Sequence, residues 1–383
     1  GSIILGQGFV MEPHVAKNII ANNQKYSEVV FPYLSGDDFS NNPDQRASRY
    51  VINFFDWKLD FCRSEYPICF ELVEKFVKSE REKVKRDTYR NNWWLYAEKG
   101  INLYKAIKGK ERIIAVPLVS KHTGVDFVES GNVYSNKLGI FTLDKWSEFC
   151  FLQSTIHNIW GWKFASTLGA GTLNYSNTIC FETFPFVQNL NSQQEQQLET
   201  IGKVYHEHRR QIMLGMQLGL TKTYNLFHDP LVDRNIVDSG EWTVDSKKLP
   251  TTHYPLSTKN LVALRKHLEK TPGTISLQEA TQGILKLREL HVQMDNAVLE
   301  AYGWSDVQLR HDFYEVDYLP ENDRIRYTIH PDARKEVLKR LLQLNHKIHE
   351  EEVKAGLWEK KKTNAKKSKP ISKSGGRDLF NQE

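Results

Sequence analysis

Short apolar runs separated by turn residues mark the first half of the chain. Three such runs are YVINFF (50–55), RIIAVPLVS (112–120) and KLGIFTL (137–143), each bounded by Gly, Asn, Asp or Ser, and they predict strands. Apolar residues at helical spacing predict helices over 13–23, 66–90 and 146–168. Together these patterns predict an α+β (mixed α/β) domain over residues 1–187.

The character of the pattern changes after Phe186. The stretch QNLNSQQEQQLETIGKVYHEHRRQIMLGMQLGL has a helical period. Two further apolar stripes predict one helix over 276–302, which Gly303 ends, and another over 332–354. We therefore expect an all-α region over 188–358. Within it, residues 229–260 are rich in Pro, Thr and Ser and predict a long loop, and residues 359–383 predict a disordered basic tail.

Composition narrows the class of protein. The 383 residues are 40% hydrophobic and 26% charged, which is typical of a soluble globular protein. No apolar run approaches the ~18 residues that a membrane span needs, and no secretory leader opens the chain, so we expect a cytoplasmic protein without membrane contact. The four cysteines form no C-x-x-C pair and are interpreted as small core residues.

The positive charge lies in two places. The net charge is +5, but residues 360–377 of the tail alone carry eight basic side chains and no acid. Within the rest, residues 45–125 hold 17 Lys and Arg against 10 Asp and Glu. This excess favours a polyanionic partner, with a solvated face containing internal pairs such as Glu82 to Arg86 as the alternative. The candidates for phosphate contacts are Arg46, Arg49, Arg81, Lys85, Arg86 and Arg90.

The chain lacks the common catalytic motifs. It has no phosphate-binding P-loop, no GxGxxG, no HExxH, no G-x-S-x-G and no EF-hand loop. His206 and His208 stand two apart on a helix and face different directions, which disfavours a shared metal. Asp37 and Asp38 are more simply explained by a turn or a helix cap. We therefore expect no catalytic residue and no metal site in this chain.

Six ordered blocks of the first 187 residues are distinctive: GSIILGQGF (1–9), VVFPYLSGDDF (29–39), PDQRASRYVINFFDW (43–57), VKSEREKVKRDTYRNNWWLYA (77–97), LQSTIHNIWGWKFAS (152–166) and NYSNTICFETFPF (174–186). Together they resemble the target recognition domain of MmeI-like type IIL restriction-modification proteins and their adenine-methyltransferase relatives. Later segments, LTKTYNLFHDP (220–230), LRELHVQMDNAVLEAYGW (287–304) and RKEVLKRLLQLNHKIHEEE (334–352), are similar to the C-terminal helical region of that family.

The resemblance implies that DNA recognition and catalysis lie in different parts of such an enzyme. The family also carries an adenine-N6 methyltransferase domain that uses S-adenosylmethionine and has an NPPY-type catalytic motif, often preceded by a nuclease. The nearest approach here, Asn42-Pro43-Asp44-Gln45, lacks the second proline and the aromatic residue. We therefore expect the specificity portion alone, either a fragment of a longer polypeptide, which the start at Gly1 inside the first block favours, or a separate subunit.

The expected partners follow from this division. They are double-stranded DNA and a methyltransferase domain or subunit, with S-adenosylmethionine bound there and no cofactor in this chain. A stand-alone DNA-binding or structural subunit of a phage-defence complex is the alternative, and an enzyme with an unrecognised site is a third possibility.

For base reading the resemblance points to three polar segments, 119–124, 133–139 and 168–178. Lys and Asn can pair with purine edges in the major groove, and Thr can meet a thymine methyl. For each residue taken singly, an ordinary polar loop position is the alternative. Trp93, Trp94, Trp160, Trp162 and His157 are expected to be core residues instead. The base-reading candidates are Ser120, Lys121, His122, Asn136, Lys137, Thr172 and Asn174.

Overall fold

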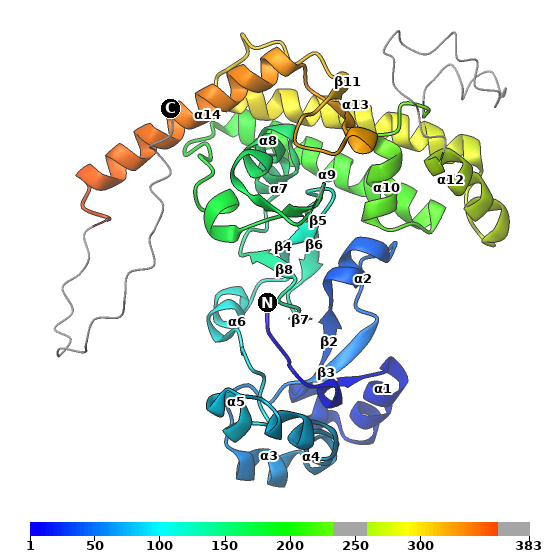
Figure 1. The fold of residues 1–383 in the computed structure, drawn as a ribbon, viewed down its shortest axis with the longest axis vertical. Coiled ribbons are helices and arrows are strands. Elements are labelled where there is room, and N and C mark those ends of the chain that lie inside the picture. The colour runs from blue at the N-terminus through cyan, green and yellow to red at the C-terminus, as the bar shows by residue number, and fades with distance from the viewer. Residues whose placement is uncertain (170, 233–258, 359–383) are drawn as a thin grey trace.

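The computed structural model describes residues 1–169, 171–232 and 259–358. These residues form a T, in which a lower unit made by roughly the first hundred residues stands beneath a broad upper part (Figure 1). Most of the predicted loop at 229–260, and the whole predicted tail at 359–383, lie outside the described residues. No described helix is long and apolar enough to cross a membrane.

The lower unit is built on a four-stranded sheet with the order β1-β3-β2-β7. β3 runs antiparallel to β1 and β2, whereas β7, from much later in the chain, joins β2 in parallel. Pro13 and Pro67 open α1 and α4, where a missing N–H leaves no bond unmade. The elements are η1 (Gln7–Phe9), β1 (Val10–Met11), α1 (Pro13–Asn22), η2 (Gln24–Glu28), β2 (Val30–Leu34), α2 (Gly36–Asn41), β3 (Arg49–Ile52), α3 (Leu59–Glu65), α4 (Pro67–Glu82), α5 (Asp87–Asn91) and α6 (Ile101–Ile107).

Two three-stranded sheets follow, with the orders β6-β4-β8 and β5-β10-β9. β4 is fully buried after its first residue, which explains its unbroken apolar run. The elements are β4 (Arg112–Pro117), β5 (Val119–Ser120), β6 (Asp126–Glu129), β7 (Val133–Tyr134), β8 (Leu138–Phe141), α7 (Trp146–Gln153), α8 (Thr155–Phe164), β9 (Ser166–Thr167), β10 (Leu173–Asn174) and η3 (Asn177–Phe181), a turn of π-helix.

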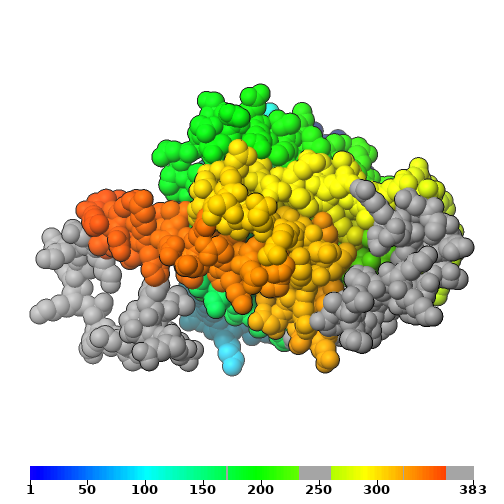
Figure 2. Space-filling model, turned by 90° about the horizontal axis from the view of Figure 1, so that it is seen from above, coloured from blue at the N-terminus to red at the C-terminus, as the bar shows by residue number. Residues whose placement is uncertain are grey.

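Helices dominate the remainder. Residues of this region, coloured yellow to orange-red, form much of the surface seen from above (Figure 2). Reciprocal side-chain caps open the two longest helices, Asn191 with Gln194 on α9 and Ser276 with Glu279 on α13. The elements are α9 (Ser192–Met216), α10 (Leu220–Phe227), α12 (Lys259–Lys270), α13 (Leu277–Ala301), β11 (Asp312–Glu315), η4 (Glu321–Asp323), β12 (Ile325–Thr328) and α14 (Pro331–Lys354).

The larger hydrophobic core does not divide at residue 188. Buried Phe149 and Leu152 of α7 belong to the same cluster as Leu198 of α9 and Met294 of α13. Gly202 makes the close packing of α9 on α7 possible, because a Cβ there would lie 2.7 Å from the carbonyl oxygen of Trp146. A second, smaller core holds the lower unit together. The second half of the first region is therefore packed as one body with the helices.

A buried ion pair reinforces this body. Arg209 of α9 is 0% exposed, and one of its terminal nitrogens lies 2.9 Å from Oδ2 of Asp126 on β6. The guanidinium also donates to the carbonyl oxygen of Val125 at 2.8 Å and to Gln153 Oε1 at 3.0 Å. Burial by itself would raise the pKa of Asp126, but the charges of Arg209 and His206 outweigh it and lower that pKa. The carboxylate therefore stays ionised at neutral pH.

The three predicted strands are confirmed as β3, β4 with β5, and β8. Two predicted helices are broken. The helix over 66–90 stops at Glu82 and restarts at Asp87. The helix over 146–168 is interrupted at Ser154, whose hydroxyl accepts a bond from the His157 N–H at 3.3 Å and so begins α8 afresh. Periodicity could not show this break, because both halves are apolar.

The helical region also contains a feature that periodicity did not predict, the antiparallel hairpin of β11 and β12. Only IRYT alternates in its burial, whereas DFYE has its two aromatic residues side by side, and both short segments stand between two strong helical patterns. Tyr327 of β12 packs edge-on against Phe227 of α10 at 5.5 Å between ring centroids. The hairpin thus covers the junction of α10 and α13.

The residues expected in the core are found there. Trp93, Trp160 and Trp162 are buried, Trp94 is half-buried with its indole N–H on the carbonyl of Trp57, and the four cysteines are free and buried. His157 is 1% exposed, and its Nδ1 lies 3.0 Å from the carbonyl oxygen of Leu152.

Candidate nucleic-acid interface

Two of the three segments expected to read bases form one small sheet. In β10, Asn174 lies opposite Val119 of β5 and opposite Ser166 of β9. Thr172 and Lys121 are the next residues along the two strands, just beyond the last paired residues, Leu173 and Ser120. Thr172 and Asn174, two apart along one strand, therefore lie on the same side of this sheet, with Lys121 at the sheet edge; we call these three residues the reader face.

The reader face is anchored from behind. Leu173, between Thr172 and Asn174, points the other way and is 1% exposed in the larger core. On the reader face, Asn174 Nδ2 donates to Ser166 Oγ at 3.0 Å, which fixes the amide plane and leaves its carbonyl oxygen and second N–H for a ligand. Leu168, beside Thr172, is 52% exposed. The face thus offers polar groups at fixed positions beside an exposed apolar side chain.

The third segment lies beside this sheet. Asn136 and Lys137 are exposed in the turn between β7 and β8. The carbonyl oxygen of Lys137 accepts a bond from the N–H of Leu118 at 2.9 Å, and the Leu118 carbonyl in turn accepts from Tyr175 at 2.7 Å. Backbone hydrogen bonds therefore link the turn to both β5 and β10.

Arg46 and Arg49 approach the same region from the lower unit. Arg49 lies opposite Tyr33 of β2, and Tyr33 lies opposite Val133 at the start of β7. Both arginines thus lie near the end of the four-stranded sheet from which the turn of Asn136 and Lys137 leaves. Among the described residues, neither guanidinium has an acidic partner. Unpaired cations therefore lie near the Asn136–Lys137 turn.

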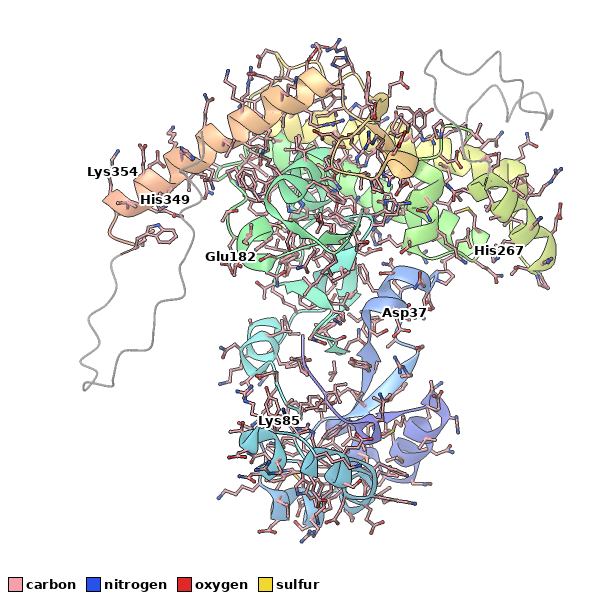
Figure 3. The ribbon with its side chains drawn as sticks, in the orientation of Figure 1. Asp37, Lys85, Glu182, His267, His349 and Lys354 are labelled. Atoms are coloured by element: carbon pink, nitrogen blue, oxygen red, sulfur yellow. The ribbon has the colours of Figure 1, made fainter. Side chains whose placement is uncertain are left out.

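The other cations form a separate group on the α4–α5 connection. Figure 3 shows Lys85 on the lower unit, whereas Asp37 of α2 lies at the junction with the upper part. Arg86 lies 3.4 Å from Glu98 Oε1, and Arg90 is paired with Asp87. The alternative of a solvated face with internal pairs therefore describes Arg86 and Arg90, although with other partners than Glu82. The structure does not bring this group to the reader face.

Arg81 does not fit the expected role. Its side chain is 1% exposed, and its guanidinium donates to four carbonyl oxygens, of Ile4, Leu5, Tyr89 and Leu95. Every direction in which the guanidinium could meet a phosphate is occupied by the chain's own backbone. The expectation of a phosphate contact is wrong for Arg81, which holds the ends of the lower unit together.

Two reader candidates are likewise corrected. The Ser120 hydroxyl donates to the carbonyl of His122 at 2.7 Å and accepts from its N–H at 3.1 Å, so it closes a turn. The His122 ring is 6% exposed, and its Nε2 lies 2.9 Å from Oδ1 of Asn225. Burial, aided by the charge of Arg326, lowers the pKa of His122 to about 3. It is a neutral interior histidine rather than a base reader.

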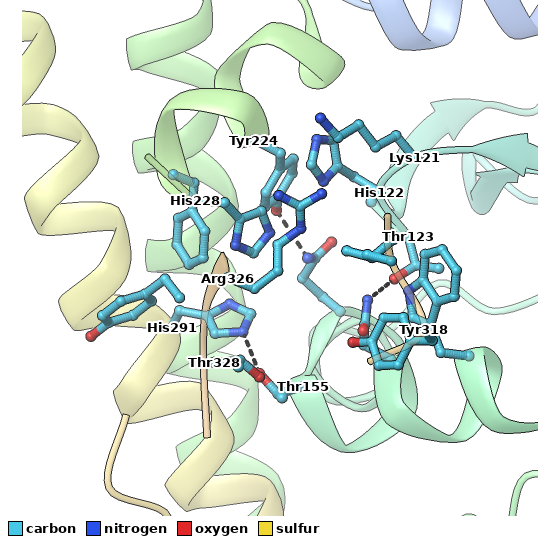
Figure 4. A pocket seen from close by; sticks show the side chains of 17 residues that line it. Lys121, His122, Thr123, Thr155, Tyr224, His228, His291, Tyr318, Arg326 and Thr328 are labelled. Carbon is cyan, nitrogen blue, oxygen red and sulfur yellow. Dashed lines mark hydrogen bonds between the residues drawn. The ribbon is translucent and has the colours of Figure 1, made fainter. Parts of the chain in front are cut away.

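His122 belongs to a polar cavity of about 60 Å³ between the small sheet and the helices (Figure 4). His228, His291 and Arg326 also line it. Since one water occupies roughly 10–15 Å³ in this measure, the cavity has room for a few waters and not for a large ligand. No group of three or more His, Cys, Asp or Glu among the described residues is arranged to hold a metal ion.

The sequence of residues 2–188 matches the family model described as MmeI, target recognition domain. This part of the chain belongs to the MmeI target recognition domain family. The domain therefore ends close to the first residue of the helical region, and the reader face, the Asn136–Lys137 turn and both arginines all lie within it.

The fold as a whole has a counterpart among solved structures. The structure of the type IIL restriction-modification enzyme MmeI in complex with DNA matches with a TM-score of 0.51 and 16% sequence identity, over 91% of this chain. The chain spans 35% of the length of that enzyme. No curated protein matches in sequence. The target recognition domain and the helices beyond it therefore share the fold of one portion of MmeI.

Proposed function

We propose that this chain is the sequence-reading portion of an S-adenosylmethionine-dependent adenine-N6 DNA methyltransferase, or of a restriction-modification enzyme fused to one. The observation that carries the proposal is the reader face. Two segments about fifty residues apart meet there, inside a target recognition domain, with their polar side chains outward and their backbone anchored in the core.

The roles divide by chemistry. Arg46 and Arg49 are suited to phosphates, which orient the protein on a duplex without reporting its sequence. Asn174 and Lys137 are suited to base edges, because an amide can bond adenine at two positions and an ammonium can donate to guanine O6 and N7. Thr172 and the exposed Leu168 offer apolar contact to a thymine methyl.

The methyl transfer belongs to a methyltransferase domain or subunit outside these residues, and S-adenosylmethionine would bind there. A protein of this kind acts on DNA in the cytoplasm. The alternative, a stand-alone specificity subunit of a phage-defence complex, needs no such partner. Co-purification of the chain with a polypeptide that binds S-adenosylmethionine distinguishes the two.

The test measures binding of the full chain to a random duplex DNA library as a function of salt. If ~5 to 8 phosphates are neutralised, log affinity should fall with log salt concentration with a slope of roughly −4 to −7. Sequencing the retained DNA should show base preferences at fixed positions. Retention of all sequences alike, or methylation of DNA by this chain alone, would contradict the proposal.

A further inference from the structure

The chain between β11 and β12 packs against the turn that joins β9 to β10. A Cβ at Gly171 would lie 2.9 Å from Cδ of Pro320, and Gly171 has a φ of +83°, so this position is restricted to glycine by both contact and conformation. Close by, the ring of Tyr318 stacks on Trp162 of α8 with 4.6 Å between centroids. The hairpin of the helical region is thus fixed to the target recognition domain.

A third contact reaches the reader face itself. Oδ2 of Asp323 lies 2.7 Å from Nζ of Lys121. Arg326 pairs with the same carboxylate. The terminal nitrogens of Arg326 lie 2.8 Å and 2.7 Å from the two oxygens of Asp323. Arg326 is 8% exposed. The Lys121 ammonium therefore pairs with a carboxylate whose position is fixed by a buried arginine.

This carboxylate is ionised at neutral pH. Burial would raise the pKa of Asp323, but the hydrogen bonds from Arg326 and Lys121 outweigh it and lower that pKa. The ion pair therefore persists over the range in which the protein would bind DNA.

The pair changes what Lys121 can do. A lysine has a flexible stem and acts on DNA mainly as a point charge, which suits phosphates better than bases. The ion pair with Asp323 restricts the Lys121 side chain. It holds the remaining N–H donors of the ammonium in one position, beside Thr172 on the reader face. A donor at a fixed place can distinguish guanine, which presents two acceptors in the major groove, from the other bases.

We propose that the β11–β12 connection is part of the recognition surface and that Asp323 is a positioning residue, which holds Lys121 where it reads a guanine. The inference rests on the proposed function, since it requires the chain to read DNA. It extends the specificity determinants beyond residue 188, into the helical region.

The experiment selects binding sites from a random duplex library with the full chain and with single variants. Lys121→Met should lose the preference for guanine at one position by about 5- to 150-fold, the range expected for one base-specific contact. Asp323→Asn should lose it at the same position, and Asp323→Glu should retain it. Asp317→Asn is the matched control, because Asp317 is an exposed acid on the same connection.

Each other outcome has a definite meaning. If Lys121→Met changes one position and Asp323→Asn changes none, Asp323 does not position the lysine. If Asp323→Asn lowers the melting temperature and weakens all sequences alike, its role is structural and the inference is wrong. If Lys121→Met changes no position, the inference fails while the proposed function stands. If the unaltered chain shows no base preference, the proposed function fails and this inference with it.

Discussion

Side chains of the same type have different roles in this protein according to what surrounds them. Arg81 and Arg49 both belong to the lower unit, yet Arg81 donates to four backbone carbonyls inside it and Arg49 lies at a sheet end beside exposed polar residues. Asn174 is held in plane by Ser166, so its remaining donor and acceptor point in fixed directions.

At this scale we predict a separation of affinity from specificity. Replacing Asn174 or Lys137 by Ala should change the base accepted at one position, at a cost of about 1 to 3 kcal/mol against the original base. Replacing Arg49 by Ala should lower affinity for all sequences alike. Sites selected by each variant are sequenced and compared.

The matched control is Ser166→Ala, which removes the partner of Asn174 and keeps the amide. Ser166→Ala should weaken the base preference at the DNA position assigned to Asn174 by less than Asn174→Ala does. A uniform loss of binding in the Asn174 and Lys137 variants, with no altered position, would exclude both as readers.

Between elements, the contacts that matter are those joining the target recognition domain to the helices. β6 and α9 are connected by Asp126 and Arg209, and the ring of His206 lies on the same carboxylate, with its Nε2 2.7 Å from Asp126 Oδ1. Lys145 and Glu195 also connect the two regions, at 2.8 Å, but both are exposed. The two ion pairs differ mainly in burial.

We predict that Asp126→Asn destabilises the fold by about 3 kcal/mol or more, because it leaves a fully buried guanidinium without its counter-charge. Glu195→Gln, which breaks the exposed pair, should leave stability nearly unchanged. Urea unfolding of both variants measures the difference. Equal stability of the two variants would show that the buried pair does not hold β6 on α9.

Over the whole molecule, titratable histidines are concentrated in the upper body. His122, His157, His228 and His291 all have a pKa lowered by burial, to about 3 for His122 and about 4 for His157. The lower unit depends on an aromatic core instead. Mild acid is therefore expected to destabilise the upper body, which contains the reader face.

We predict that stability falls as the pH drops from 6.5 towards 4. His157 is neutral in the folded protein down to about pH 4 but takes up a proton near 6.5 when unfolded. Its contribution is thus complete above 6.5 and is lost at about 1.4 kcal/mol per pH unit below it. Denaturant unfolding of the protein and of His157→Gln at pH 7.5 and 5 checks this. The variant should lose less stability than the parent, and an equal loss would rule out His157 as a source.

The sequence was sufficient for the features that depend on neighbouring residues. The apolar run of 112–120 predicted β4, which is buried on both faces, and the stripe ending before Gly303 predicted α13 with its stop. The six blocks predicted the target recognition domain, because they occur in order from its first residues to its last. The polar segments 119–124, 133–139 and 168–178 contain Lys121, Asn136, Lys137, Thr172 and Asn174, which the structure gathers.

Which of those polar residues face outward was not predictable in the same way. Periodicity reports the apolar side of a segment, but not the distant segment that pairs with it, so the register that places Asn174 opposite Val119 arises only on folding. Arg81 is buried because carbonyls from four separate residues converge on it, and Lys121 is tethered because a hairpin some two hundred residues later carries Asp323 to it. A charged side chain has the same local pattern whether it meets water, a phosphate or a buried carbonyl, and long-range packing decides among the three.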